Sequence, residues 1–128
     1  MARIRPFRAV RPPRDKAHLV ASRSYVNYTE EDLNDKLDGN PFTFLHVIRP
    51  EMAGSVRKTM KRNERYHLVR EGYNYFRNMG MLEKDIQQAY YVYRQSSAET
   101  SYTGVIAGVA VQDYLDGKVK IHEETITQ

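Results

Sequence analysis

The sequence contains no cysteine, and this absence excludes disulfides, thiolate nucleophiles and cysteine-ligated zinc or iron–sulfur sites. A protein without disulfides fits a reducing compartment, and the first residues, MARIRPFRAVRPPRDK, lack the apolar segment of a secretory signal. We therefore expect a cytoplasmic protein. Long apolar runs are also missing, since the longest, Val105 to Val111, is much shorter than the roughly 20 residues that cross a bilayer. The sequence predicts no membrane span and no membrane partner.

Tryptophan is absent as well, but tyrosine is abundant, with 10 residues among 128. Hydrophobic residues make up 41% of the chain and charged residues 28%, which is near the average of globular proteins and excludes the disordered and fibrous classes. The length suits one domain of ordinary size, residues 1–128, or the N-terminal fragment of a larger protein.

Positive charge is concentrated in an N-terminal arm, where the basic residues are opposed by a single acid, Asp15. A second basic run follows between residues 57 and 65. Either run can contact nucleic-acid phosphates or be ordinary solvated surface. Nucleic-acid binding ranks last among the candidate functions, because neither run is accompanied by a recognition motif or an aromatic stacking platform. The two runs consist of Arg3, Arg5, Arg8, Arg11, Arg14, Lys16 and Arg23, and of Arg57, Lys58, Lys61, Arg62 and Arg65.

Two helices are predicted from capping and periodicity. Thr29 is a good N-cap and acids follow it, which predicts a helix over 29–38 that ends at Gly39. From residue 55 to 79, apolar or small residues recur every three or four positions, which predicts a long amphipathic helix. Gly72 in its middle costs about 1 kcal/mol relative to alanine, so we expect a bend or a close contact there.

Strands are predicted in three places. The run FTFLHVI, residues 42–48, is bounded by prolines and is almost continuously apolar, which favours a strand buried on both faces. The segments 89–95 and 102–114 flank the turn SSAET and predict a hairpin. Gly104 and Gly108 in its second strand indicate a bulge or a closely approached backbone.

These elements predict an α+β fold. We expect a mixed or antiparallel sheet of about four strands, with the helix at about 55–79 packed on one face and a short helix near 29–38. If the chain is a fragment, the missing remainder exposes an apolar patch or a sheet edge, so we expect it to form a homo-oligomer through that surface.

Two clusters carry reactive side chains. His46, Arg49 and Glu51 follow a predicted buried strand, and Arg49 can offer a planar fork to a phosphate or carboxylate. Alternatively, His46 is a hydrogen-bonded core histidine and the other two are surface charges.

The second cluster lies near the end of the sequence, from His122 to Thr125. A His/Glu pair can act as general base and orienter or as metal ligands, and a neighbouring hydroxyl can contact phosphate. The alternative is a solvated terminus, because the H-E-x-x-H spacing of a zinc site is missing, and no metal site is predicted.

Four stretches of the sequence belong together: VASRSYVNYTEEDL, NPFTFLHVIRPE, AYYVYRQ and TGVIAGVAVQDYLDGKVKIHEET. In this order they resemble the N-terminal part of a family of bacterial and archaeal proteins known as domain of unknown function 1015. The tyrosine of RSYV, Tyr25, matches the family's P-P-Y-D, but Val26 stands in place of the acid, and Asn27 is the nearest polar substitute. Residues 46–51 are similar to H-x-x-R-P-E, and residues 117–125 to G-x-[IV]-K-x-H-E-x-T.

The family's chains are several times longer and carry a later D-G-H-H-R motif, similar to that of ParB-like and sulfiredoxin-like phosphotransferases, including free-serine kinases. This sequence has no such motif. The resemblance therefore implies an N-terminal fragment that is inactive alone.

The resemblance implies a phosphotransferase or phosphatase that acts on a small phosphorylated metabolite such as phosphoserine. The alternative is a non-catalytic regulatory module that binds a nucleotide or metabolite. Either has a small-molecule ligand as partner, and the cofactor stays open, with a nucleotide or pyrophosphate and Mg²⁺ as candidates. The implied catalytic residues are Glu123 as general base and His122 as acid or orienter, and the implied ligand-binding residues are Arg49, Thr125, Tyr25 and His46.

Overall fold

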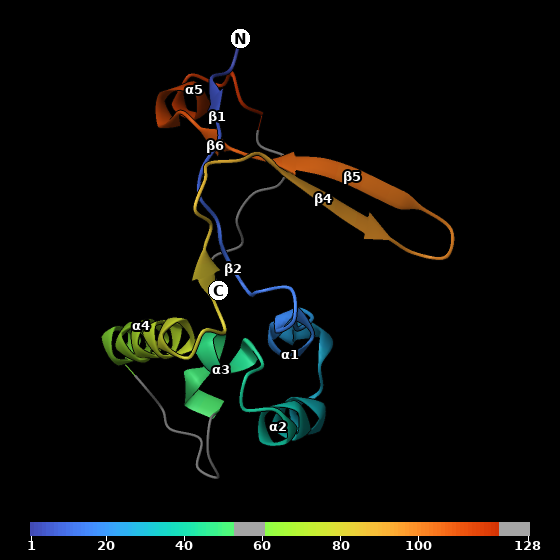
Figure 1. Cartoon of the computed structure of the whole chain (residues 1–128), viewed down its shortest axis with the longest axis vertical. Helices are drawn as coiled ribbons and strands as arrows, with labels where there is room; N and C mark the ends of the chain where they lie inside the picture. The colour runs from blue at the N-terminus through green and yellow to red at the C-terminus, as the bar shows by residue number, and fades with distance from the viewer. Residues whose placement is uncertain (53–60, 121–128) are drawn as a thin grey trace. The chain divides into compact units, whose positions relative to one another are not determined.

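The computed structural model describes residues 1–52 and 61–120, and these fall into two compact units. We call Val10–Lys84 the helical unit, and Met1–Ala9 together with the segment from Asp85 the hairpin unit (Figure 1). Both helices and strands are present, so the predicted α+β class is confirmed. In the described part of the chain, no helix is long and apolar enough to cross a membrane.

In its described residues, the helical unit contains six helical segments and one short ladder, in which β2 pairs antiparallel with β3. The predicted helix near 29–38 is confirmed as α2: the backbone N–H of Asp32 donates to Thr29 Oγ1 at 3.1 Å, so the threonine caps the first turn. The elements are β2 (Val10–Arg11), α1 (Ala17–Val20), the 3-10 helix η1 (Tyr25–Asn27), α2 (Glu30–Gly39), α3 (Leu45–Ile48), the 3-10 helix η2 (Pro50–Met52), α4 (Arg62–Asn78) and β3 (Glu83–Lys84).

The predicted long helix is confirmed over α4, while the first part of its predicted range, residues 55–60, lies outside the described residues. It packs against α3 and η2, so its predicted position on the face of a sheet is wrong. Gly72 faces α3, and a Cβ atom built there would be 3.5 Å from Val47 Cα, which is an ordinary van der Waals distance. After the helix, Gly80 has φ +70°, and the N–H of Met81 donates to Phe76 O at 2.9 Å, which closes the final turn.

The predicted strand at 42–48 is wrong, because this run forms a turn followed by α3. A short, continuously apolar run does not distinguish a buried strand from a buried helical turn, since both bury every side chain. Leu45 packs with Leu33 and Leu37 of α2, whereas Val47 packs in a second cluster around Phe76 of α4. The run is apolar because it lies between these two clusters.

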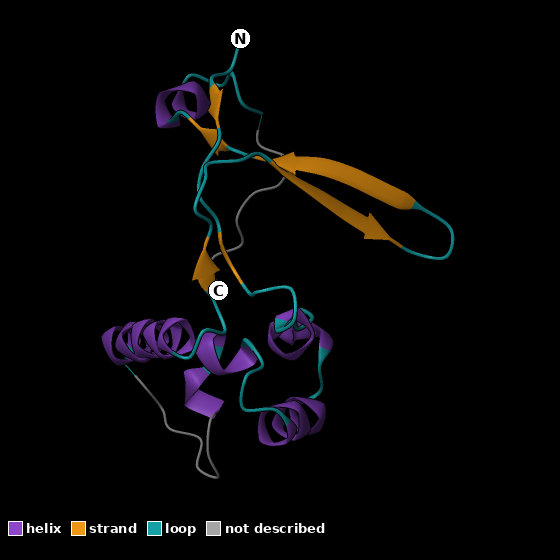
Figure 2. Ribbon diagram, in the orientation of Figure 1, coloured by secondary structure: helices purple, strands orange, loops and turns teal. Residues whose placement is uncertain are grey.

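Up to residue 120, where the description ends, the hairpin unit contains two separate ladders (Figure 2). β4 (Tyr91–Ser96) pairs antiparallel with β5 (Ser101–Ile106), which confirms the hairpin, and β1 (Ile4–Arg5) pairs antiparallel with β6 (Gly108–Val109). The predicted strand 102–114 is therefore too long. In the structure the chain changes pairing partner after Ile106, and the last part of the predicted range lies in the helix α5 (Val111–Leu115). Gly108 allows the change, because a Cβ atom there would be 3.4 Å from Arg5 O.

The predicted sheet of about four strands is also wrong. The described strands form three antiparallel pairs, β1 with β6, β2 with β3, and β4 with β5. The strands β1, β2 and β3 have two residues each, which is too short to show an alternating pattern in the sequence.

Candidate functional site

Two of the predicted ligand-binding residues, Tyr25 and Arg49, lie together in the helical unit. Tyr25 begins η1, and Arg49 is the residue at which α3 ends. The guanidinium carbon of Arg49 is 4.8 Å from the centre of the Tyr25 ring. A cation at this distance is attracted to the electron-rich face of the ring, and the contact fixes the plane of the guanidinium.

Glu51 lies between two arginines of the same unit. Its Oε1 is 2.8 Å from Arg49 Nε, and its Oε2 is 3.4 Å from Arg65 Nε. Arg65, on the first turn of α4, also donates from Nη2 to the backbone oxygen of Ile48 at 2.9 Å. We call Tyr25, Arg49, Glu51 and Arg65 the arginine cluster. Its three charged side chains are partly buried, and two guanidinium groups converge on one carboxylate.

His46 holds two elements of the fold together. Its Nε2 is 3.0 Å from Leu37 O and 3.0 Å from Asn40 O. Because both neighbours are carbonyl acceptors, Nε2 must carry the hydrogen. The ring thus satisfies carbonyl groups at the end of α2, where helices leave such groups without intrahelical partners. The contact joins α2 to α3, and a ligand-binding role for His46 stays a prediction.

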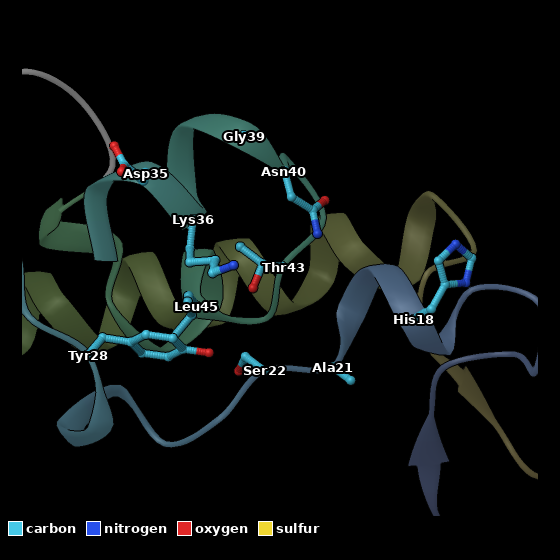
Figure 3. Close-up of a pocket in the computed structure, with 10 residues that line it drawn as sticks. All are labelled: His18, Ala21, Ser22, Tyr28, Asp35, Lys36, Gly39, Asn40, Thr43 and Leu45. Atoms are coloured by element: carbon cyan, nitrogen blue, oxygen red, sulfur yellow. The ribbon is translucent and has the colours of Figure 1, made fainter. Parts of the chain in front are cut away.

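A pocket of about 360 Å³ lies beside α2 (Figure 3). Several of its polar groups also hold the fold: Asn40 Nδ2 donates to Leu19 O at 2.7 Å, and Tyr28 Oη accepts from Arg23 N at 3.1 Å. Thr43, on the pocket wall, is 4% exposed. The lining residues are His18, Ala21, Ser22, Tyr28, Asp35, Lys36, Gly39, Asn40, Thr43 and Leu45.

Sequence reasoning missed this pocket. The available signal was the concentration of hydroxyl groups in SRSYVNYT, residues 22–29. Whether these groups line a pocket depends on the turn before α3, and that segment was predicted to be a strand. Arg65 was also missed as a member of the arginine cluster, because it was grouped with the solvated basic face of its helix.

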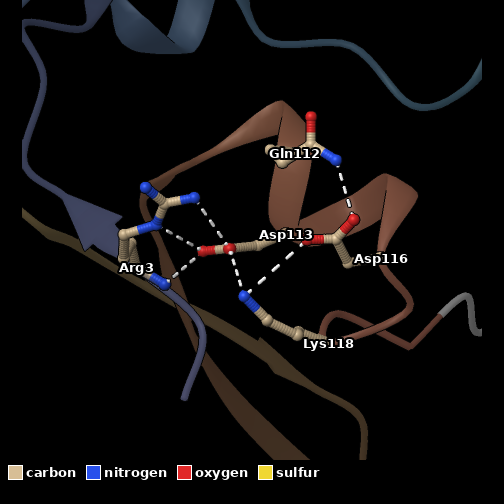
Figure 4. A network of polar contacts seen from close by, with 5 residues as sticks. All are labelled: Arg3, Gln112, Asp113, Asp116 and Lys118. Atoms are coloured by element: carbon tan, nitrogen blue, oxygen red, sulfur yellow. Dashed lines mark hydrogen bonds and ion pairs between the residues drawn. The ribbon is translucent and has the colours of Figure 1, made fainter.

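The hairpin unit has a polar centre at Asp113, whose side chain is fully buried (Figure 4). Arg3 donates to it from the backbone N (2.7 Å), Nε (3.1 Å) and Nη2 (2.9 Å), and Lys118 Nζ donates at 3.3 Å. The hydrogen bonds from Arg3 hold the pKa of the Asp113 carboxyl well below its usual range. This network ties the N-terminal strand to α5, and a contact across 110 positions leaves no local signal in the sequence.

The predicted catalytic pair His122 and Glu123, and the predicted phosphate ligand Thr125, lie outside the described residues. Within residues 1–52 and 61–120, no three His, Asp or Glu side chains lie close enough together to hold a metal ion.

Comparison with known proteins found one family. No curated protein and no solved structure matches the chain. A family model described as "Protein of unknown function (DUF1015)" matches residues 4–128. That match includes both units and nearly every residue, so the chain belongs to the DUF1015 family of proteins of unknown function.

Proposed function

We propose that this chain binds a small phosphorylated metabolite at the arginine cluster. The observation that carries the proposal is the contact between Tyr25 and Arg49, 4.8 Å from ring centre to guanidinium carbon. The two residues belong to separate motifs that resemble the family, and the fold of the helical unit brings them together. A planar guanidinium held on an aromatic face is pre-organised for bidentate contact with a phosphate.

The charges of the cluster also suit an anion. Arg49 and Arg65 contribute two positive charges, and Glu51 offsets one. A phosphate monoester carries roughly −1.5 to −2 charges at neutral pH, so it attracts the two guanidinium groups more strongly than one carboxylate does. Hydrogen bonds between charged groups contribute about 1.5–3 kcal/mol each. The incoming phosphate is therefore expected to displace Glu51 from Arg49, and Glu51 keeps Arg65 as its partner.

The resemblance to ParB-like phosphotransferases suggests phosphoserine as the metabolite to test first. If the protein is a phosphotransferase or phosphatase, we assign Glu123 as the general base and His122 as the acid or orienter. Thr125 is assigned as a phosphate contact, because a transferring phosphoryl group needs donors for its developing charge. A nucleotide or pyrophosphate with Mg²⁺ then supplies or accepts the phosphoryl group. This candidate is favoured by the match of residues 117–125 to the family motif.

A regulatory module that binds without turnover is the second candidate. The pocket beside α2 favours it, since about 360 Å³ lies within the size range of small-molecule sites and its walls carry hydroxyl, amide and ammonium groups. Such a module needs the ligand contacts of the helical unit and no general base.

Titration calorimetry of the 128-residue chain with phosphoserine and with serine tests the binding. We expect phosphoserine to bind and serine to bind at least about tenfold more weakly, because serine lacks the phosphate. Arg49→Lys keeps the charge but loses the fork and the stacking, so it should weaken phosphoserine binding about tenfold or more. Arg77→Lys, at an exposed position near the end of α4, is the matched control and should bind normally.

Glu51→Gln sharpens the test. If phosphate displaces Glu51, removal of its negative charge should tighten phosphoserine binding while leaving serine unchanged. Equal affinities for phosphoserine and serine, or equal losses in Arg49→Lys and Arg77→Lys, would overturn the proposal. The two candidates separate in a longer family member assayed for two products, free phosphate and a phosphorylated nucleotide. Formation of either product that disappears in Glu123→Gln identifies the enzyme, and binding without either product identifies the module.

A further inference from the structure

In the part of the chain that the structure describes, β5 is an edge strand. Among the described residues β5 pairs with β4 alone, so the hairpin is a sheet of two strands. The strand SYTGVI contains no charged residue and no proline, which are the usual devices that keep an edge strand from pairing with another chain. Its apolar side chains are also accessible, with Tyr102 71% and Val105 66% exposed.

Both faces of the hairpin carry exposed apolar side chains. The register pairs Tyr91 with Ile106 and Tyr93 with Gly104 on one face, and Val92 with Val105 on the other. A hairpin of two strands is only marginally stable in water, and additional strands or a packed helix are needed for independent stability. In the described part of the chain the hairpin is a separate ladder of two strands (Figure 2), so pairing with further strands would stabilise it.

We propose that two copies of the chain associate by antiparallel pairing of β5 with β5, which joins the two hairpins into one sheet of four strands. An antiparallel pair of identical strands has a two-fold axis, so each chain presents the same surface to the other. The backbone N–H and C=O groups along one β5 edge then pair with those along the other.

The sequence of β5 selects the register. A two-fold axis normal to the sheet keeps each residue on its own face, so only residues of the same face can be opposite each other. With Gly104 on the axis, Tyr102 lies opposite Ile106 of the second copy, and Thr103 lies opposite Val105 of the second copy. These are the aromatic and β-branched cross-strand pairs that stabilise antiparallel sheets. An axis at Thr103 would instead place Tyr102 opposite a glycine and lose that pair.

Charge also favours this edge over the other. β4 carries Arg94, which pairs with Thr103, whereas β5 is uncharged. When the β5 strands meet, the two β4 strands are separated by three strand spacings, roughly 14 Å, and this exceeds the screening length of about 8 Å at physiological salt. No like charges therefore face one another across the proposed interface.

Gly104 provides a sharp test, because a Cβ atom there meets nothing within 4 Å and the hairpin itself should tolerate a side chain. Gly104→Lys places two ammonium groups opposite each other at the axis, which destabilises the pair. By sedimentation velocity over a concentration series, we expect the native chain to form dimers and Gly104→Lys to raise the dimer dissociation constant at least about tenfold. Far-UV circular dichroism checks that the variant is folded.

Two further samples test the geometry. Val92→Lys adds the same charge on exposed β4 and should dimerise like the native chain. An equimolar mixture of Gly104→Lys and Gly104→Glu should recover dimers, because opposite charges then meet at the axis. A native chain that stays monomeric throughout the series would overturn the proposal. So would equal effects of Gly104→Lys and Val92→Lys, or no recovery in the mixture.

Discussion

Gly72 in α4 provides the most direct test of the packing between α3 and α4. A Cβ atom built at this position would be 3.5 Å from Val47 Cα and 3.7 Å from Val47 Cγ2, which are ordinary van der Waals distances. An alanine therefore fits without displacing α3. Glycine inside a helix costs roughly 0.5–1 kcal/mol relative to alanine, so Gly72→Ala should stabilise the helical unit by about that amount.

Gly80 is the matched control at the end of the same helix. Its φ of +70° lies in the left-handed region, where an L side chain crowds the backbone even though nothing else lies within 4 Å of a Cβ atom there. The left-handed conformation costs a non-glycine residue roughly 1–2 kcal/mol. Gly80→Ala should therefore destabilise the unit by about 1–2 kcal/mol, opposite in sign to Gly72→Ala.

The pair is measured by urea unfolding, followed by far-UV circular dichroism, with thermal unfolding as a second readout. For a unit of this size, 1 kcal/mol shifts Tm by about 4–8 °C, so the two variants should be separated by roughly 6 °C or more. The urea dependence should be unchanged, because neither methyl group alters the surface exposed on unfolding. If Gly72→Ala lowers the stability, α3 lies closer to α4 than described, and the packing argument is refuted.

Two further predictions concern single contacts. Asp113→Asn should destabilise the hairpin unit at pH 7, because it removes the carboxylate charge that Arg3 contacts. The pKa of Asp113 is lowered in the folded state, so the ionised carboxylate stabilises the fold fully at pH values above its unfolded pKa of about 3.9. That stabilisation is lost as the pH falls below about 3.9. The stability difference between native and variant chains, measured by urea unfolding, should thus shrink from pH 7 to pH 3, and a constant difference would contradict the assignment. Thr29→Ala should cost about 1 kcal/mol by removing the cap on α2. Thr29→Ser keeps the hydroxyl and should be nearly neutral by the same assay, so an equal loss in both variants would argue against the cap.

The elements that could be predicted from the sequence are those with local causes. The start of α2 follows from the Thr29 hydroxyl, the end of α4 from Gly80, and the hairpin from two β-rich runs around a turn. In each case the deciding contact joins residues only a few positions apart. Such contacts are readable as sequence patterns because the sequence itself places the partners together.

The segments that could not be predicted depend on distant partners. The run at 42–48 becomes α3 because α2 and α4 supply apolar surfaces on both of its sides, and periodicity alone cannot show that arrangement. The strand after Tyr102 is interrupted because Gly108 pairs with Arg5, more than a hundred positions earlier. The single predicted sheet becomes three pairs for the same reason.

In the arginine cluster, too, the local features could be predicted from the sequence and the contacts between distant residues could not. The sequence pointed to Arg49 and Glu51 as neighbours and, through resemblance to the family, to Tyr25. It did not indicate that Tyr25 lies under the guanidinium or that Arg65 reaches the same carboxylate, because both contacts require the fold of the helical unit. The residue types were predictable, and their convergence was not.

The two proposals concern separate units, and this allows each to act as the other's control. Ligand binding depends on Arg49 in the helical unit, and self-association depends on the edge of β5 in the hairpin unit. Arg49→Lys should therefore weaken phosphoserine binding and leave the dimer unchanged, while Gly104→Lys should disrupt the dimer and leave binding unchanged. If Gly104→Lys also abolished binding, the two proposals would not be independent, and binding measured over a range of chain concentrations would show whether the ligand site depends on the dimer.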